Sequence, residues 1–259
     1  MSLSKRGERA ILPPLPYFAL QASVQHDLYD AVSNPHGAIP MCVAESRGQF
    51  YPAFADRLAA ARAGTIEAGT GQYTNMSGRD RFRAAVASTI SRTVLGGRLE
   101  LEPSAFVISS GCGALLLQLS LLLLDEGDCV LLPTPTYPAL YNDVQTLAAG
   151  RIIDVPISGD NFRLTRSALD RAAERAGGRA RILLLLNPSN PLGVVHSAAE
   201  MRMAAAWVRE RGIHLISGEG LNEWDKVLKD NVHAPHHSRE GAHSDPTRAC
   251  KGAVGITSP

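Results

Sequence analysis

From about Leu101 onward, short aliphatic runs alternate with longer segments in which apolar residues recur every three or four positions. Short runs of this kind predict buried strands, and the periodic segments predict helices. The predicted strands are Phe106–Ser109, Cys129–Pro133, Ile152–Pro156, Ile182–Leu186 and Ile213–Ser217. The predicted helices between them are Ala114–Leu124, Tyr137–Ala149, Ser167–Ala176 and Ala198–Arg211. This alternation favours a parallel, doubly wound α/β sheet.

Three of these segments carry further local signals. Ile182–Leu186 holds five consecutive aliphatic residues, which predicts a strand buried on both faces. The segment from Ala114 is apolar on every side, so we expect a helix buried under the sheet. Ser197 with Glu200 predicts a capping box, and Gly212 follows where a helix commonly ends.

The N-terminal part of the chain has a weaker pattern. Met1–Ala10 is predicted to be a solvated arm, followed by a helix over Leu20–Val32 and a short strand over Ile39–Ala44. A helix is expected over Pro52–Ala63, and Ser77 is expected to cap another that carries Phe82.

After Ser217 the alternating pattern stops. Gly218–Pro259 holds no convincing strand and at most one short helix, Asn222–Lys229. Four histidines follow among Pro, Ser and Gly, but their spacing matches no finger or helix-borne metal site. They are His233, His236, His237 and His243. The interpretation that this composition favours is a disordered polar tail.

Composition narrows the functional classes. The 259 residues include 26 basic and 25 acidic ones, which gives no sign of a nucleic-acid footprint. Cysteines are scattered without a Cys-x-x-Cys pair, which suits a reducing compartment. The longest apolar run is too short to span a bilayer and no signal peptide is visible, so a cytoplasmic protein is expected.

Three turns beside predicted strand ends carry candidate chemistry. Ser109–Gly113 leads into a helix, where free backbone N–H groups suit a phosphate, although many α/β proteins have a glycine there. Pro133–Pro138 fixes Tyr137 on a stiff backbone, either to stack on a flat heterocycle or simply to pack on the turn. Asn187–Gly193 presents an Asn pair at the sheet edge, where an ordinary Asx-Pro turn is the alternative.

Taken together, these features resemble fold-type I pyridoxal-phosphate enzymes of the class I/II aminotransferase family, closest to its 1-aminocyclopropane-1-carboxylate synthase branch. The phrases that carry the resemblance occur in the family's order over about Tyr17–Ser217. They are Asn34-Pro-His-Gly-Ala-Ile, Met41-Cys-Val-Ala-Glu45, Gly71-Gln-Tyr-Thr, Pro133-Thr-Pro-Thr-Tyr-Pro, Asn187-Pro-Ser-Asn-Pro-Leu-Gly and Gly212-Ile-His-Leu-Ile-Ser217.

The resemblance implies a three-layer α/β/α fold with a mostly parallel sheet, incomplete here because the family's sixth and seventh strands have no counterpart. It implies an N-terminal arm and partial small domain over 1–70 and a cofactor-binding large domain over 71–217. Residues 218–259 are unmatched. An amino-acid substrate and a homodimer are also implied, with no nucleic-acid or membrane partner.

The resemblance also implies site roles for pyridoxal 5'-phosphate. The turn at Gly111, Cys112 and Gly113 would hold its phosphate, Tyr137 would stack on its ring, and Asn190 would bond its phenolic oxygen. Two further residues are implied from the N-terminal part of the chain. Tyr73 would reach the phosphate of a partner subunit, and Glu45 would lie near the substrate, followed by Ser46 where the family has asparagine.

Several family residues are missing. The family's Asp for the ring nitrogen is replaced by Gly218, and the resemblance was expected to end at Ser217, with Glu219 a chance match. The Schiff-base lysine and the two arginines for phosphate and carboxylate have no counterpart, and Lys5 only coincidentally follows Ser-Leu-Ser. The sequence therefore predicts no catalytic residue, no metal, and weak, non-covalent cofactor binding. The alternatives are a non-catalytic remnant, a partner of a full-length paralogue, or an incomplete gene model.

Overall fold

The computed structural model describes residues 2–11, 16–41, 50–62, 71–157, 159, 162–219 and 254–257. These residues form two compact units. One unit is Pro13–Thr74, and the other comprises Met1–Leu12 with Asn75–Pro259. The second unit contains the sheet and most of the candidate site, so it is described first.

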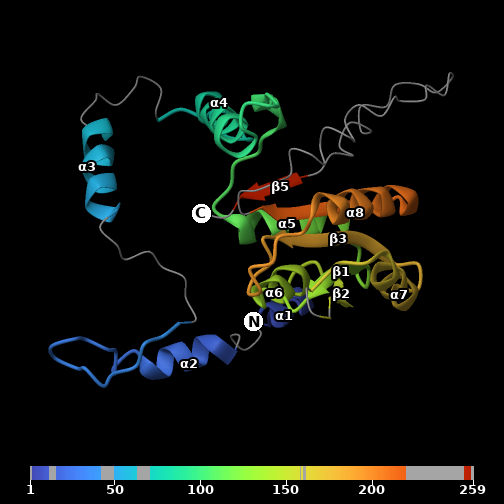
Figure 1. The fold of residues 1–259 in the computed structure, drawn as a ribbon, viewed down its shortest axis with the longest axis horizontal. Helices are drawn as coiled ribbons and strands as arrows, with labels where there is room; N and C mark the ends of the chain where they lie inside the picture. Colours follow the sequence, from blue (N-terminus) through green and yellow to red (C-terminus); the bar gives the residue numbers. More distant parts are fainter. Residues whose placement is uncertain are drawn as a thin grey trace. The chain divides into compact units, whose positions relative to one another are not determined.

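The sheet has five strands in the order β2-β1-β3-β4-β5, and every neighbouring pair in it is parallel (Figure 1). The strands are β1 (Cys129–Thr134), β2 (Arg151–Pro156), β3 (Ala180–Asn187), β4 (His214–Glu219) and β5 (Val254–Thr257). The four strands predicted from Cys129 to Ser217 are confirmed within three residues at each end. A parallel sheet of the predicted α/β class is therefore present.

Helices cover both faces of this sheet, as Figure 1 shows. The helices are α5 (Cys112–Leu123), α6 (Ala139–Gln145), α7 (Arg166–Ala176) and α8 (Ala198–Arg211). In β3, Leu183 and Leu185 pack with residues of α7 and α8, whereas Ile182 and Leu184 pack with residues of α5 and α6. Because side chains alternate along a strand, a continuous aliphatic run fills two cores at once. The predicted three-layer arrangement follows from this alternation.

The termini of α8 confirm the local signals in the sequence. The Ser197 hydroxyl and the Glu200 carboxylate form the capping box, and Gly212 ends the helix with φ of 64°. Helix α5 differs from the prediction, because only one side of it is buried. Leu116 is 5% exposed, whereas Leu122 is 79% exposed. A helix with 3.6 residues per turn presents only one stripe of side chains to a flat sheet, even when its side chains are apolar all round.

Two predictions about strands are wrong. Phe106–Ser109 is not a strand. The amide of Ile108 instead donates to the carbonyl of Ser77 at 2.9 Å, in the loop before a helix, so no strand ladder forms there. Conversely, the C-terminal segment expected to lack strands contains β5, which pairs with β4 from Ile216 to Glu219. An open strand edge offers unpaired N–H and C=O groups, and β5 satisfies them along β4.

The remaining elements of this unit are short. Met1–Ala10, predicted as an arm, contains α1 (Lys5–Ala10), whose start is capped because the Ser4 hydroxyl accepts from the Gly7 amide. Helix α4 (Asp80–Thr89) continues into a π-helical turn, and a 3-10 turn precedes α5. The N-cap of α4 is Arg79 without a side-chain bond, so the prediction that Ser77 caps it is wrong. Ser77 lies two residues too early to reach the free amides.

The Pro13–Thr74 unit contains α2 (Pro16–Val24) and α3 (Phe50–Arg62). The helix predicted over Leu20–Val32 ends at Val24. The chain after it bonds to Ala38 instead, and the Asp30 carboxylate accepts from the amides of Val32 and Ser33 in a turn. The described part of Ile39–Ala44 is not a strand. Residues 42–44, and the helix predicted over Asn222–Lys229, lie outside the described residues.

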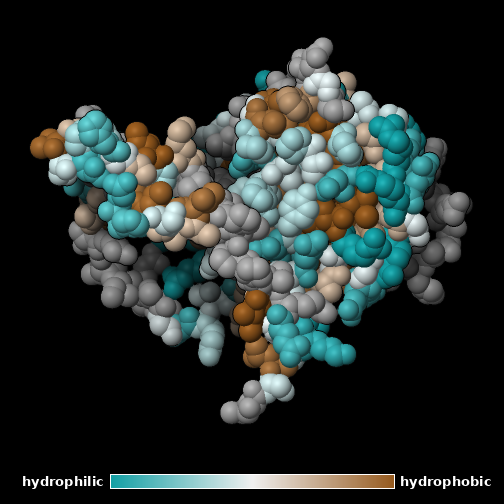
Figure 2. All heavy atoms as spheres, turned by 90° about the horizontal axis from the view of Figure 1, so that it is seen from below, coloured by the Kyte–Doolittle hydropathy of each residue, from teal (hydrophilic) through white to brown (hydrophobic). Residues whose placement is uncertain are grey.

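Apolar side chains remain at the surface of both units. Leu121 and Leu122 of α5 are 45% and 79% exposed, and Val32 and Met41 of the other unit are each 92% exposed. Figure 2 shows apolar patches among hydrophilic residues on one face. No helix in the described part of the chain combines the length and apolarity that crossing a membrane needs.

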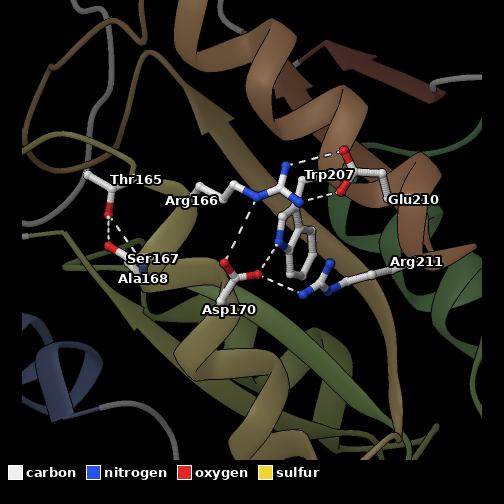
Figure 3. A network of polar contacts seen from close by, with 8 residues as sticks. All are labelled: Thr165, Arg166, Ser167, Ala168, Asp170, Trp207, Glu210 and Arg211. Atoms are coloured by element: carbon white, nitrogen blue, oxygen red, sulfur yellow. Dashed lines mark hydrogen bonds and ion pairs between the residues drawn. The ribbon is translucent and has the colours of Figure 1, made fainter.

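A polar network ties α7 to α8 (Figure 3). The indole N–H of Trp207, which is fully buried, donates to Asp170 Oδ1 at 2.8 Å. Arg211 donates to the same oxygen at 2.6 Å, and its guanidinium lies 4.3 Å from the centre of the Trp207 ring. Arg166 forms a two-bond ion pair with Glu210. Asp170 is therefore the acceptor on which the buried indole depends.

Replacing Asp170 by Ala should lower the free energy of unfolding by about 2 kcal/mol, because the indole N–H of Trp207 loses its acceptor in a buried position. Asp170→Asn keeps an oxygen at that point and should cost less than about 1 kcal/mol. Urea unfolding followed by circular dichroism measures both. Equal stability of the Ala variant and the unchanged protein would show that the network does not stabilise the α7–α8 contact.

Candidate functional site

Two of the three predicted site turns lie at one edge of the sheet. Strands β1 and β3 are neighbours and parallel, so the turns that follow Thr134 and Asn187 leave the sheet at the same edge. In open α/β sheets, ligands bind beyond the carboxyl ends of the strands. The sheet order therefore places the turns that carry Tyr137 and Asn190 at the same edge.

The backbone of the turn into α5 is suited to binding an anion. Gly111 is the N-cap of α5 with φ of 85° and ψ of 170°, a conformation that favours glycine. A side chain added at Gly111 would meet nothing within 4 Å. The first amide of α5 that bonds within the helix is that of Leu115, to Gly111 at 3.4 Å. Amides before it point out of the helix start, where the helix dipole also favours an anion.

A carboxyl group borders this turn. A Cβ added at Gly113 would lie 3.6 Å from Asp143 Oδ1, so the carboxyl of α6 faces the first turn of α5. Burial raises the pKa of Asp143. Cys112 lies half-buried against the core between α5, α6 and the sheet. No pattern in the sequence points to Asp143, because it is one acidic residue within a helix.

Tyr137 stands between β1 and α6. Its carbonyl accepts from the Leu140 amide at 3.2 Å, and Pro138 is the N-cap of α6. The residue is 39% exposed, so part of it is accessible to a ligand. The peptide bond between Thr134 and Pro135 is cis. These contacts fix the backbone of Tyr137 and leave the ring accessible.

The two asparagines after β3 have different environments. Asn187 is 1% exposed, and its Oδ1 accepts from the buried amide of His196 at 2.9 Å. Asn190 is exposed. The turn between them is closed by the amide of Ser189, which donates to Val194 at 2.8 Å, and by Gly193, which donates to Ser189 at 2.7 Å. Asn187 therefore holds the turn, and Asn190 is the amide available to a ligand.

Behind this turn lies a buried charged cluster that the sequence did not reveal beyond the capping box. The Glu200 carboxylate accepts from the Leu164 amide at 3.0 Å and from Arg163 at 2.7 Å, in addition to Ser197. His196 is 1% exposed, and its Nδ1 has no hydrogen-bond partner and lies 3.9 Å from Glu200 Oε1.

The charged cluster shifts the pKa values of His196 and Glu200. Burial lowers the pKa of His196, and Arg163 adds to this, whereas Glu200 works against it. Burial also opposes the charged form of Glu200, but hydrogen bonds from Ser197, Leu164 and Arg163 outweigh that effect and lower its pKa. His196 is therefore held neutral and Glu200 charged over the neutral range.

The other two predicted site residues lie outside the described part of the unit that contains the sheet. Tyr73 belongs to the Pro13–Thr74 unit and is 99% exposed. Glu45 lies outside the described residues. No group of three or more His, Cys, Asp or Glu side chains in the described ranges is arranged to hold a metal ion.

The contrast between the asparagines gives a direct test. Asn187→Ala should lower the free energy of unfolding by about 1–3 kcal/mol, because the buried amide of His196 loses its acceptor. Asn190→Ala, the matched control in the same turn, should change it by less than about 0.5 kcal/mol. Urea unfolding measures both, and similar losses for the two variants would refute the assignment.

The charged cluster predicts a pH dependence. Because the pKa of His196 is lowered from its ordinary 6.5, the unfolded chain binds a proton below about pH 6.5 that the folded chain does not. The free energy of unfolding should therefore decrease as pH falls from 7 to 5, by at most about 1.4 kcal/mol per pH unit. Urea unfolding of His196→Asn should show a flatter dependence. Parallel curves for the two proteins would exclude His196 as the titrating group.

Comparison with known sequences relates the chain to members of one protein family. 1-Aminocyclopropane-1-carboxylate synthase 5 of Oryza sativa subsp. japonica is 35% identical over 217 residues, 79% of this chain and 40% of the relative. Synthase 3 of the same plant is 33% identical over 219 residues, 79% and 46% of the two chains. A probable aminotransferase of Arabidopsis thaliana is 31% identical over 216 residues. The chain spans less than half the length of these relatives.

Solved structures share the fold. Aspartate aminotransferase of Thermus thermophilus superposes with a TM-score of 0.66 at 22% identity, over 88% of this chain and 58% of the other. The methionine aminotransferase YbdL of Escherichia coli gives a TM-score of 0.61 at 20% identity, over 85% and 51%. These similarities show the α/β fold of the pyridoxal-phosphate transferases, of which this chain has an incomplete sheet.

The family described as aminotransferase class I and II matches residues 48–219. The match includes Gly218 and Glu219, so the expectation that the likeness ends at Ser217, with Glu219 a chance match, was wrong by two residues. Because the match covers well over half of the sequence, this chain belongs to the aminotransferase class I and II family.

Proposed function

We propose that this chain binds pyridoxal 5'-phosphate non-covalently and weakly, as an aminotransferase-like or 1-aminocyclopropane-1-carboxylate synthase-like protein of amino-acid metabolism without turnover of its own. One observation carries this proposal. Residues suited to holding the cofactor gather near one sheet edge, whereas no lysine occurs between Lys5 and Lys226, a range that contains the whole family match.

Three parts of the described structure fit the cofactor. The open turn at Gly111, Cys112 and Gly113 offers backbone amides to its phosphate, and its small residues leave room for close approach. The accessible ring of Tyr137 suits a flat partner, and the amide of Asn190 can donate to a ring oxygen. When bound, the cofactor withdraws electrons from the α-carbon of an amino acid. This chain's residues would orient the ring and hold its phosphate.

Other parts of the donor set do not fit. The family match contains no amine that could bond to the aldehyde, and general acid–base transfer at the α-carbon needs a positioned group of this kind. Asp143 borders the phosphate turn and opposes a dianion when it is charged. These mismatches support weak binding and argue against catalysis by this chain.

The partner subunit and the substrate belong to the same proposal. Tyr73, fully exposed on its own unit, would reach the phosphate of a second copy in a homodimer, and Glu45 would face the amino-acid substrate. Cys112 and Cys129, the two cysteines among the described residues, do not form disulfides, which suits a reducing, cytoplasmic setting. A full-length relative could replace the second copy, which is the non-catalytic alternative.

The absence of a family lysine gives a chemical test. After incubation with pyridoxal phosphate and reduction by borohydride, mass spectrometry of the intact chain should show no stoichiometric adduct at a single lysine. Equilibrium dialysis should still show phosphate-dependent binding, which Asn190→Ala weakens. Assays with amino acids and 2-oxo acids, or with S-adenosylmethionine, should show no turnover.

The matched control for these assays is the double variant Tyr137→Ala, Asn190→Ala, which removes both ring contacts. Turnover by the unchanged chain well above this control would overturn the proposal that it is inactive. A single, fully labelled lysine would overturn the proposal that binding is non-covalent.

A further inference from the structure

Gly218 in β4 occupies a position where the structure leaves no space for a larger residue. A Cβ added there would lie 2.7 Å from Leu186 Cδ2, below any normal contact distance. Leu186 is the partner of Gly218 in the register between β3 and β4. The side chain of Leu186 therefore covers the place that a side chain at residue 218 would fill.

A side chain at residue 218 would point toward the layer of α5 and α6, and α5 begins at the Gly111–Gly113 turn. Leu186 packs against the core formed by Ile182, Leu184 and Ile216 with α5 and α6, and that core also includes Cys112 at the start of α5. Because side chains alternate along β4, residue 218 points to the same face as Ile216. Asn187, one residue further along β3, bonds instead to the loop before α8. The covered place thus lies on the α5 side, at the carboxyl edge.

We propose that Leu186, which covers Gly218 where the resembled family has the aspartate for the ring nitrogen, gives that end of the cofactor site a hydrocarbon surface. The site, formed by the Gly111–Gly113 turn, Tyr137 and Asn190, would then bind a phosphorylated flat ring whether or not the ring carries a nitrogen at that end. This inference rests on the proposed function. A ring nitrogen that meets hydrocarbon gains no charged hydrogen bond, and its protonated form would be desolvated without a partner. Affinity should therefore come from the phosphate turn, Tyr137 and Asn190.

The test compares two alcohols, pyridoxine 5'-phosphate and its analogue with C–H in place of the ring nitrogen. Alcohols cannot react with lysines, so only the non-covalent seat is measured. Isothermal titration calorimetry of the full chain in phosphate-free buffer should give dissociation constants within threefold of each other. Pyridoxine 5'-phosphate binding more than tenfold tighter would overturn this inference and leave the proposed function standing. Failure of both to bind would overturn both.

Variants assign the effect to Leu186. In Leu186→Ala with Gly218→Asp, the shorter side chain admits the carboxylate, and pyridoxine 5'-phosphate should bind at least tenfold more tightly than the analogue. The double variant Leu184→Ala, Gly218→Asp removes the same side-chain volume two residues earlier on the same face of β3. It should show no such preference. Near-ultraviolet circular dichroism from buried Trp207 verifies folding. A folded Leu186 variant without the preference, or a folded Leu184 variant with it, would refute the role of Leu186.

Discussion

The arrangement of this protein depends on burying strand β3 from both sides. Leu183 and Leu185 are fully buried toward α7 and α8, and Ile182 and Leu184 are almost fully buried toward α5 and α6. Truncating one such leucine to alanine typically costs about 2–5 kcal/mol, a large part of a domain's usual stability of about 5–15 kcal/mol. The strand leaves these cores at Asn187, so the turn that presents Asn190 starts from a strand held on both faces.

Behind that turn, rigid contacts and available groups are separated. Asn187 and the buried pair of His196 and Glu200 fix the backbone through hydrogen bonds that solvent does not reach. Asn190 and Tyr137 make no comparable demand on the fold, and both remain accessible. This separation suits a binding site, because a rigid scaffold can hold Asn190 and Tyr137 in place for a ligand while other residues stabilise the fold. A chain without a lysine to bond the cofactor covalently would still keep Tyr137 and Asn190 in position.

The sequence predicted the central sheet well because period-two burial and helix caps are local signals. The strand at Ile182–Leu186 and the capping box at Ser197 needed no tertiary information. It failed where the outcome depends on partners far along the chain. Phe106–Ser109 has the composition of a strand but no ladder, and β5 forms from a segment whose sequence lacks a strand pattern because β4 offers it an open edge. The carboxyl of Asp143 beside Gly113, and Leu186 over Gly218, likewise arise only when separate elements pack.

We propose that a site for pyridoxal phosphate persists at the carboxyl edge of the sheet without covalent chemistry. Hydrogen–deuterium exchange of the full chain, with and without saturating pyridoxal phosphate, is the decisive measurement, because amide protection reports where a ligand orders the backbone. Exchange should slow in three segments, 109–115, 134–138 and 187–193, and should not change in α7 or α8. Unchanged exchange in these three segments, or protection confined to other parts of the chain, would contradict it.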